Sequence, residues 1–353
     1  MNKRFLIALA AAMALCFTMP QPAQAKTWNL RFTGSDFEAH PSVANGLLPW
    51  LKEIEKATNG QVKIRYFAPN TICPVSEIVT SIESGAIDMG AIDHARNSGR
   101  FPLHDVFLLP LITGNSTAQG ITAWRTLQSS PLLQKEMASV KVLGYWGGGS
   151  MQVLTKEKPV TRLEDMKGLR MTCLSKPFAD AVQSLGANPI TVPLPDIYMT
   201  LSRNSADSAL FSLLASGSIK IQNLIKHVTM VSLCKDVRFV GINKELWDSF
   251  PPDIQKAIES TCCDEKWAMR MSQTMDNGDI AGKELLTKSG ATFHTLDAAE
   301  YERWVKACEP LDKAWIDKVV ALGVSRSDAE ALLAQVRKTG AEVTAELAGS
   351  SAN

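Results

Sequence analysis

The sequence has no excess of charge of either sign. Its 353 residues contain 37 lysines and arginines against 36 aspartates and glutamates, a formal net charge of +1. Loss of an N-terminal segment that contains Lys3 and Arg4 would change this to −1. Because binding to a polyanion needs a basic surface, we expect no nucleic-acid partner.

Long apolar runs are missing after residue 25. None reaches the roughly 20 residues that a membrane-spanning helix needs, so we expect no stable membrane insertion. The run from Phe5 to Phe17 is also too short, and it lies between Lys3-Arg4 and Ala23-Gln24-Ala25. This order is typical of a cleavable secretory signal, so we predict a signal peptide at residues 1–25 and an exported mature chain.

Metal-binding patterns are absent as well. No Cys-x-x-Cys or Cys/His spacing of a zinc site occurs, and we predict no cofactor. Asp36, Glu38 and His40 alternate, but such a triplet is more often a solvated strand end than a metal site. The six cysteines after residue 25 could pair in fifteen ways. A chain of this size does not need disulfides, so we expect several buried free thiols.

The motifs of exported hydrolases are incomplete. Ser232-Leu233-Cys234-Lys235 matches the Ser-x-x-Lys of penicillin-interacting enzymes, and Lys338-Thr339-Gly340 matches their Lys-Thr-Gly strand. The second match lies in a helical pattern, and no Ser-Asp-Asn lies between the two. G-x-S-x-G and H-E-x-x-H are also missing. We therefore predict that the protein is not an enzyme, with an exported serine hydrolase as the minor alternative.

What the sequence does contain is an alternation of strand-like and helix-like segments. This order predicts an α/β fold with largely parallel sheets, and the mature length predicts two lobes. Predicted strands cover 28–32, 62–66, 87–91, 140–146, 190–192, 237–242 and 292–296, and predicted helices cover 41–58, 117–135, 178–185 and a long helical region over 251–290.

Two predicted strands indicate a ligand site. The strand at 140–146 ends at Trp146 and is followed by Gly147-Gly148-Gly149, where the backbone can approach a ligand or turn sharply. Lys167-Gly168 leads into a strand ending at Thr172, whose alternate side chains share one face. We expect this face to hold a ligand. Tryptophan is often a core residue, but the glycines favour Trp146 as a ligand platform.

The order of motifs over the mature chain resembles the solute-binding proteins of TRAP (tripartite ATP-independent periplasmic) transporters, the DctP-like family. The resemblance is carried by HP at 40–41, IESGAIDMG at 82–90, GRFPL at 99–103, LLP at 108–110, VLGYW at 142–146, LEDMKGL at 163–169, LGANP at 185–189 and NKELWD at 243–248. A binding protein of an ABC importer or chemoreceptor is the main alternative.

The resemblance implies a two-lobed periplasmic binding protein, type II-like, with hinge strands and a long helix spanning both lobes. Lobe I would take residues 26–150 and 239–285, and lobe II would take 151–238 and 286–345, followed by a flexible tail at 346–353. It also implies a periplasmic location, a small organic ligand held by lobe closure, and TRAP membrane permease subunits as partners.

Two departures from the family pattern concern the ligand. Most relatives carry an arginine that binds a substrate carboxylate at the position of Thr172, and a hydroxyl cannot supply the missing charge. Leu210 and Phe211 occupy positions that are usually polar. Losing the charge and its polar partners together is self-consistent, because an unpartnered buried arginine would be costly.

Three ligand classes therefore remain. An uncharged or aromatic molecule could stack on Trp146 and Phe211, beside the close backbone of Gly148. An organic acid could be held by a relocated cation, Arg96 or Arg170. An amine could be held by one of the nearby carboxylates, which are those of Asp36, Glu38 and Asp93.

Overall fold

The computed structural model describes residues 26–350 of the chain. The predicted signal peptide at 1–25 lies outside the described residues, as do 351–353. No helix within residues 26–350 combines the length and the apolar character needed to cross a membrane.

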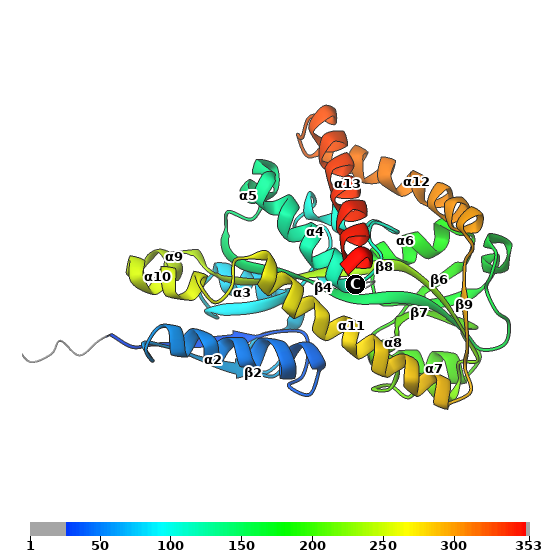
Figure 1. The fold of residues 1–353 in the computed structure, drawn as a ribbon, viewed down its shortest axis with the longest axis horizontal. Helices are drawn as coiled ribbons and strands as arrows, with labels where there is room; N and C mark the ends of the chain where they lie inside the picture. Colours follow the sequence, from blue (N-terminus) through cyan, green and yellow to red (C-terminus); the bar gives the residue numbers. More distant parts are fainter. Residues whose placement is uncertain (1–25, 351–353) are drawn as a thin grey trace, which may run out of the picture.

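A single sheet of nine strands runs through the molecule (Figure 1). The strands are β1 (Trp28–Thr33), β2 (Val62–Phe67), β3 (Met89–Asp93), β4 (Val140–Thr155), β5 (Arg170–Cys173), β6 (Asn188–Thr191), β7 (Ser208–Ser212), β8 (His227–Asn243) and β9 (Thr292–Thr295). Their order is β2-β1-β3-β8-β4-β7-β5-β6, with β9 beside β8. The outer pairs are parallel, as predicted, but β4 and β8 at the centre are antiparallel.

The long strands β4 and β8 join two halves of the molecule. They pair along their length, from Val140 opposite Asn243 to Thr155 opposite His227. The carboxyl half of β8 also pairs with β3, whereas the carboxyl half of β4 pairs with β7. One half of the molecule is therefore built on β2-β1-β3 and the other on β7-β5-β6. This is the two-lobed α/β fold with hinge strands that was predicted.

Helices cover both halves. They are α2 (Leu48–Ala57), preceded by a π-helical turn (Val43–Leu47), α3 (Ile78–Glu83), α4 (Ser116–Ser129), α5 (Pro131–Glu136), α6 (Lys176–Ser184), α7 (Ile197–Ser202), α8 (Leu213–Ser216), α9 (Lys244–Asp248), α10 (Pro252–Glu259), α11 (Glu265–Lys288), α12 (Ala298–Ala321) and α13 (Arg326–Ser350). The prediction of a flexible tail from 346 falls on a segment that is helical as far as residue 350.

Three segments differ from the sequence-based expectation. β4 does not end at Trp146 but continues through the three glycines. Glycine is required there because neighbouring segments lie close: a Cβ on Gly147 would clash with the carbonyl of Ser116. The helix expected at 117–135 breaks before Pro131, which starts α5. The region 251–290 forms two helices, because Asp264 caps a new helix by accepting from the Trp267 N–H at 2.7 Å.

Helix α11 crosses from one half of the molecule to the other (Figure 1, yellow). Asp276 accepts hydrogen bonds from the first N–H groups of α4, those of Ser116 and Thr117, each at 2.9 Å. One turn further along, Asp279 accepts from the N–H of Leu214 in α8 at 2.8 Å. Two carboxylates of one helix thus cap helices that belong to different halves.

The six cysteines of residues 26–350 are all free thiols, four of them buried. The Sγ atoms of Cys262 and Cys263 lie 3.3 Å apart. Disulfides therefore contribute nothing to holding the described fold together, and the buried cysteines pack as small apolar side chains.

Candidate functional site

A cavity of about 540 Å³ is bordered by residues of both halves. Apolar side chains form most of its wall: Phe37, Pro41, Met151, Leu174, Phe178, Leu194, Pro195, Phe211, Leu214, Ile219 and Met275. Segments that are far apart in the sequence meet at this cavity. They are the loop after β1, the end of β3, the start of α6 and the β7–α8 turn. A cavity of this size and lining suits a small organic molecule.

Arg238 of β8 organises the charged side of the cavity. Its side chain is buried, and its guanidinium hydrogen-bonds to Asp36. Its Nη2 lies 3.4 Å from Asp93 Oδ2, and its Nε lies 3.5 Å from Asp236 Oδ2. Strand register brings these groups together, because Asp93 of β3 sits directly opposite Arg238. One guanidinium thus faces three carboxyl groups.

The protonation state of the three carboxyl groups sets the net charge of this cluster. Burial raises the pKa of Asp236 well above its usual range, and the charge of Asp93 adds to this effect, so Asp236 holds a proton. Burial opposes ionisation of Asp93 too, but the charges of Arg96 and Arg238 outweigh it and lower the pKa of Asp93 to about 2. Burial opposes ionisation of Asp36 as well, but the charge of Arg238 outweighs it and lowers the pKa of Asp36.

Burial lowers the pKa of His40, the remaining titratable group of the lining, so this ring is neutral at neutral pH. Two ionised carboxylates, Asp36 and Asp93, therefore face two guanidinium groups, Arg96 and Arg238. Among the lining residues that the structure describes, the ionic charges cancel.

Arg96 is the more accessible of the two cations. It lies in the short turn Ala95–Asn97 after β3, and its side chain is 33% exposed. Its Nε lies 3.3 Å from Asp93 Oδ2, and Asp93 is its one ion-pair partner among the described residues. A guanidinium has five N–H donors in a planar fork, so Arg96 keeps donors available for a second carboxylate.

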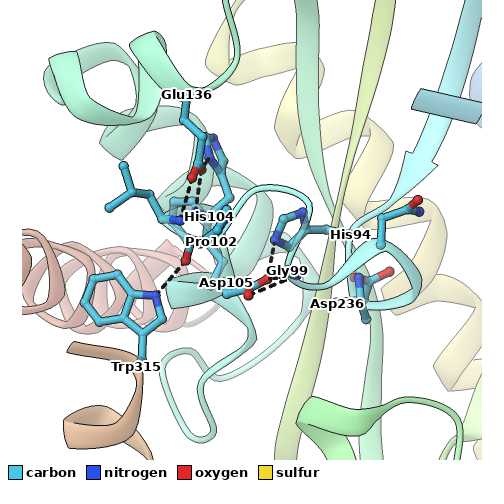
Figure 2. A network of polar contacts seen from close by, with 12 residues as sticks. His94, Gly99, Pro102, His104, Asp105, Glu136, Asp236 and Trp315 are labelled. Carbon is cyan, nitrogen blue, oxygen red and sulfur yellow. Dashed lines mark hydrogen bonds and ion pairs between the residues drawn. The ribbon is translucent and has the colours of Figure 1, made fainter. Parts of the chain in front are cut away.

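A buried polar network fixes the segment that carries Arg96 (Figure 2). His94 Nε2 lies 3.2 Å from Asp105, which also accepts from the N–H of Gly99 at 3.1 Å. The Asp236 carboxyl accepts from the N–H of Ala95 at 2.8 Å. Because these contacts tie residues 94–99 to Asp105 and to Asp236 of β8, the Arg96 backbone is held at the cavity edge.

The same network continues to the helices behind it (Figure 2). Trp315 of α12 donates to the carbonyl of Pro102 at 2.9 Å, and Lys318 of α12 donates to Asp105 at 2.7 Å. His104 Nδ1 lies 2.7 Å from Glu136 of α5. Burial lowers the pKa of His104. The loop between β3 and α4 is therefore anchored on two sides.

Three of the eight predicted site residues line the cavity: Arg96, Asp93 and Phe211. The other five lie outside its lining, and a role for them in ligand binding stays a prediction; they are Trp146, Gly148, Thr172, Leu210 and Glu38.

Four of these five residues have surroundings that keep them out of the cavity lining. Trp146 is 1% exposed and packs edge-on against Trp267, with ring centroids 6.0 Å apart. Gly148 lies against Asp236, and a Cβ at this glycine would be within 3.0 Å of that side chain. Leu210 is buried in a core cluster, whereas Glu38 is exposed.

The strand with the Lys167-Gly168 entry forms β5, but its polar side chains are engaged elsewhere. Thr172 is fully buried, and its hydroxyl donates to the carbonyl of Ser208 at 3.5 Å. Arg170 pairs with Asp207 on the surface, at 2.6 Å from Nη2 to Oδ1. Neither residue lines the cavity.

Sequence reasoning did not find Arg238, Asp236, His40 or Ser175 as lining residues. The segment Asp236-Val237-Arg238 gave a usable signal, since two charges alternate within an otherwise apolar strand and so point to one face. Ser175 gave the weaker signal of a serine before Lys176-Pro177, a typical helix start.

Two lobes joined by hinge strands, with an apolar cavity that both of them border, define a binding protein for a small molecule. Residues 35–318 match the bacterial extracellular solute-binding protein family 7, DctP. The chain belongs to this family, whose members are solute-binding proteins and not enzymes, and it is of the TRAP type.

The similarity to known proteins extends over most of the length of both chains. The C4-dicarboxylate-binding periplasmic protein of Rhodobacter capsulatus is 25% identical over 331 residues, which cover 91% of this chain and 96% of that protein. The TRAP solute-binding protein of Bordetella bronchiseptica, solved with (R)- and (S)-mandelate, is 27% identical, covers 89% of this chain and 99% of its own, and has a TM-score of 0.77. A Rhodoferax ferrireducens TRAP protein, solved with benzoate, is 22% identical with a TM-score of 0.80 over 91% of this chain and 100% of its own, and shares the fold.

Proposed function

We propose that this protein captures a small aromatic carboxylate in the periplasm and delivers it to the membrane permease subunits of a TRAP transporter. The observation that carries the ligand class is the position of Arg96, an accessible guanidinium at the edge of a cavity with largely apolar walls. Arg96 would bind the carboxylate, and the apolar walls would enclose the ring.

Aromatic side chains support the ring of such a ligand. Phe37, Phe178 and Phe211 all line the cavity, and they come from both halves of the molecule. Aromatic pairs contribute about 0.5–1.5 kcal/mol each beyond the burial of area. Phe37 is 67% exposed, so closure of the lobes over a ligand would bury it and stabilise the closed form.

Two similar proteins point to different acids. The Bordetella bronchiseptica protein binds mandelate, an aromatic acid with one carboxylate, whereas the Rhodobacter capsulatus protein is a C4-dicarboxylate binder. A dicarboxylate needs a cation at each end. Arg238 is buried and already faces Asp36, Asp93 and Asp236, so Arg96 is the more accessible cation of the lining. This favours one carboxylate and an aromatic ring.

The amine alternative has less support, because both ionised carboxylates of the lining already face a guanidinium. Transport and location follow from the family and from the sequence. Residues 1–25 have the pattern of a secretory signal, which supports export, and TRAP-type binding proteins serve a permease. Genes for a two-part membrane permease beside this one would support the partnership, and a neighbouring ATPase gene would overturn it.

Calorimetric titration with mandelate, benzoate, succinate, benzyl alcohol and benzylamine tests the ligand class. We expect the aromatic acids to bind most tightly. Arg96→Ala should weaken their binding about 10- to 100-fold, as expected for a hydrogen bond to a charged group. Arg170→Ala is the matched control and should change nothing, because Arg170 pairs with Asp207 outside the cavity.

Stronger binding of succinate or benzylamine than of the aromatic acids would refute the proposed ligand class. Unchanged affinity in Arg96→Ala would remove Arg96 from the site. Mass spectrometry of small molecules released on unfolding of the purified protein gives an independent answer on the charge class of the natural ligand.

A further inference from the structure

Ser175 is a buried polar residue of the cavity that the fold leaves without a partner. It lines the cavity from the second half of the molecule and is 8% exposed. Within the described part of the chain, its Oγ has no hydrogen-bond partner. Leaving a buried hydroxyl unpaired is unfavourable, so a partner missing from the folded chain alone is expected to occupy this position.

The backbone around Ser175 adds donors. Ser175 is the residue before α6, has an extended conformation (φ −153°, ψ 162°) and makes no side-chain capping bond. The first N–H groups of a helix have no partner within the helix, and Pro177 has none to offer. The N–H groups of Lys176 and Phe178 are thus the open donors at this end, and the helix dipole favours an anion there.

We propose that Ser175 and the amino end of α6 bind the ligand carboxylate from the second lobe, while Arg96 binds it from the first. This inference rests on the proposed function and extends it to the residue that sets specificity for an acid. A carboxylate has about four acceptor positions, so it can accept from a guanidinium and a hydroxyl together. Bonds to both lobes would make the closed form the one that the acid prefers.

The proposal accounts for the departure at Thr172. The resemblance to the family led us to expect the ligand carboxylate near Thr172, but Thr172 is buried and its hydroxyl donates to the carbonyl of Ser208. Three residues later the chain leaves β5 and reaches Ser175 at the cavity.

Titration of Ser175→Ala with benzoate, and with benzyl alcohol as the neutral comparison, tests the proposal. We expect benzoate to bind about tenfold more weakly, with benzyl alcohol unchanged, as for loss of a hydrogen bond to a charged group. Ser184→Ala is the matched control in the same helix, because Ser184 lies outside the cavity lining and its Oγ donates to the carbonyl of Ala181 at 2.8 Å. It should leave both affinities within about twofold.

A second variant separates ligand binding from helix capping. Ser175→Asp should raise the melting temperature of the unliganded protein, because a carboxylate is stabilising at a helix start. The same charge should weaken benzoate binding by more than tenfold, because it occupies the donors and repels the ligand. Weaker benzoate binding in the Asp variant shows that an anion binds near this helix end, and Ser175→Ala decides whether the hydroxyl itself contacts it.

The outcomes distinguish the two proposals. The wild-type protein could bind benzoate, with the binding weakened by Arg96→Ala but not by Ser175→Ala or Ser175→Asp. In that case the second-lobe contact is wrong and the proposed function stands. If wild type binds no aromatic acid at all, the proposed function is wrong and this contact with it. Equal losses for benzoate and benzyl alcohol in Ser175→Ala would also overturn the contact, since its selectivity for an anion would be gone.

Discussion

Gly282 of α11 tests how tightly the crossing helix must lie against the second lobe. A Cβ built on Gly282 would lie well inside 3.0 Å of the carbonyl oxygen of Leu213, at the start of α8. The obstacle is backbone, so it cannot move aside as a side chain can. The close approach also brings Asp279 to the N–H of Leu214. We therefore expect Gly282→Ala to push α11 away from α8.

The size of the effect follows from two opposing contributions. Forcing an extra carbon into a packed interface costs typically 1–3 kcal/mol. Alanine in place of a helical glycine returns about 1 kcal/mol. Since the lost Asp279–Leu214 hydrogen bond costs about a further 1 kcal/mol, we expect a net destabilisation of about 1–3 kcal/mol.

Urea unfolding followed by circular dichroism measures this change. Gly349→Ala is the matched control, because Gly349 also lies in a helix but nothing is within 4 Å of a Cβ built there. It should be neutral or stabilising by up to about 1 kcal/mol. Gly278→Ala should lie between the two, because the atom that it meets is the flexible end of Leu214. Equal stability of Gly282→Ala and Gly349→Ala would refute the argument.

Two further predictions concern other sites. Burial lowers the pKa of Lys235 from 10.5 to about 8, which corresponds to a cost of roughly 3 kcal/mol for keeping the ammonium buried at neutral pH. Between these two pH values the unfolded chain binds more protons than the folded chain, so the free energy of unfolding should rise from pH 8 to 10.5. Lys235→Met should lose this rise and should be more stable at pH 7 by about 1–2 kcal/mol, because loss of the hydrogen bond to the Ser232 carbonyl offsets part of the gain. A rise that persists in the variant would contradict this. Phe211→Leu should weaken benzoate binding about 2- to 10-fold in calorimetry, through loss of the aromatic contact, and no change would exclude Phe211 from contact with the ring.

Local patterns predicted most elements of this fold correctly. Alternating Trp28, Leu30 and Phe32 form β1, and the helix predicted over 178–185 corresponds to α6. These features depend on side chains that are close in sequence, so periodicity and capping are enough to find them. Family motifs over most of the chain identified the two-lobed architecture and the class of protein.

The residues of the candidate site were predicted less completely than the helices and strands. Phe211, Arg96 and Asp93 were expected there and line the cavity. Thr172 and Trp146 were expected there too, but an alternating face does not tell which of the two sides of a strand meets a core and which a cavity. That choice is made by the helices and strands packed on each side.

By itself, therefore, the sequence determined the order and type of most elements. It also predicted an export signal and, by resemblance to the family, the replacement of a carboxylate-binding arginine by Thr172. Only the tertiary structure decided which charges share one space. Asp36, Asp93, Asp236 and Arg238 come from separate segments, and strand register brings them within ion-pair distance. Their pKa values, and hence the cation left available for a ligand, depend on that proximity and on burial, which no local pattern contains.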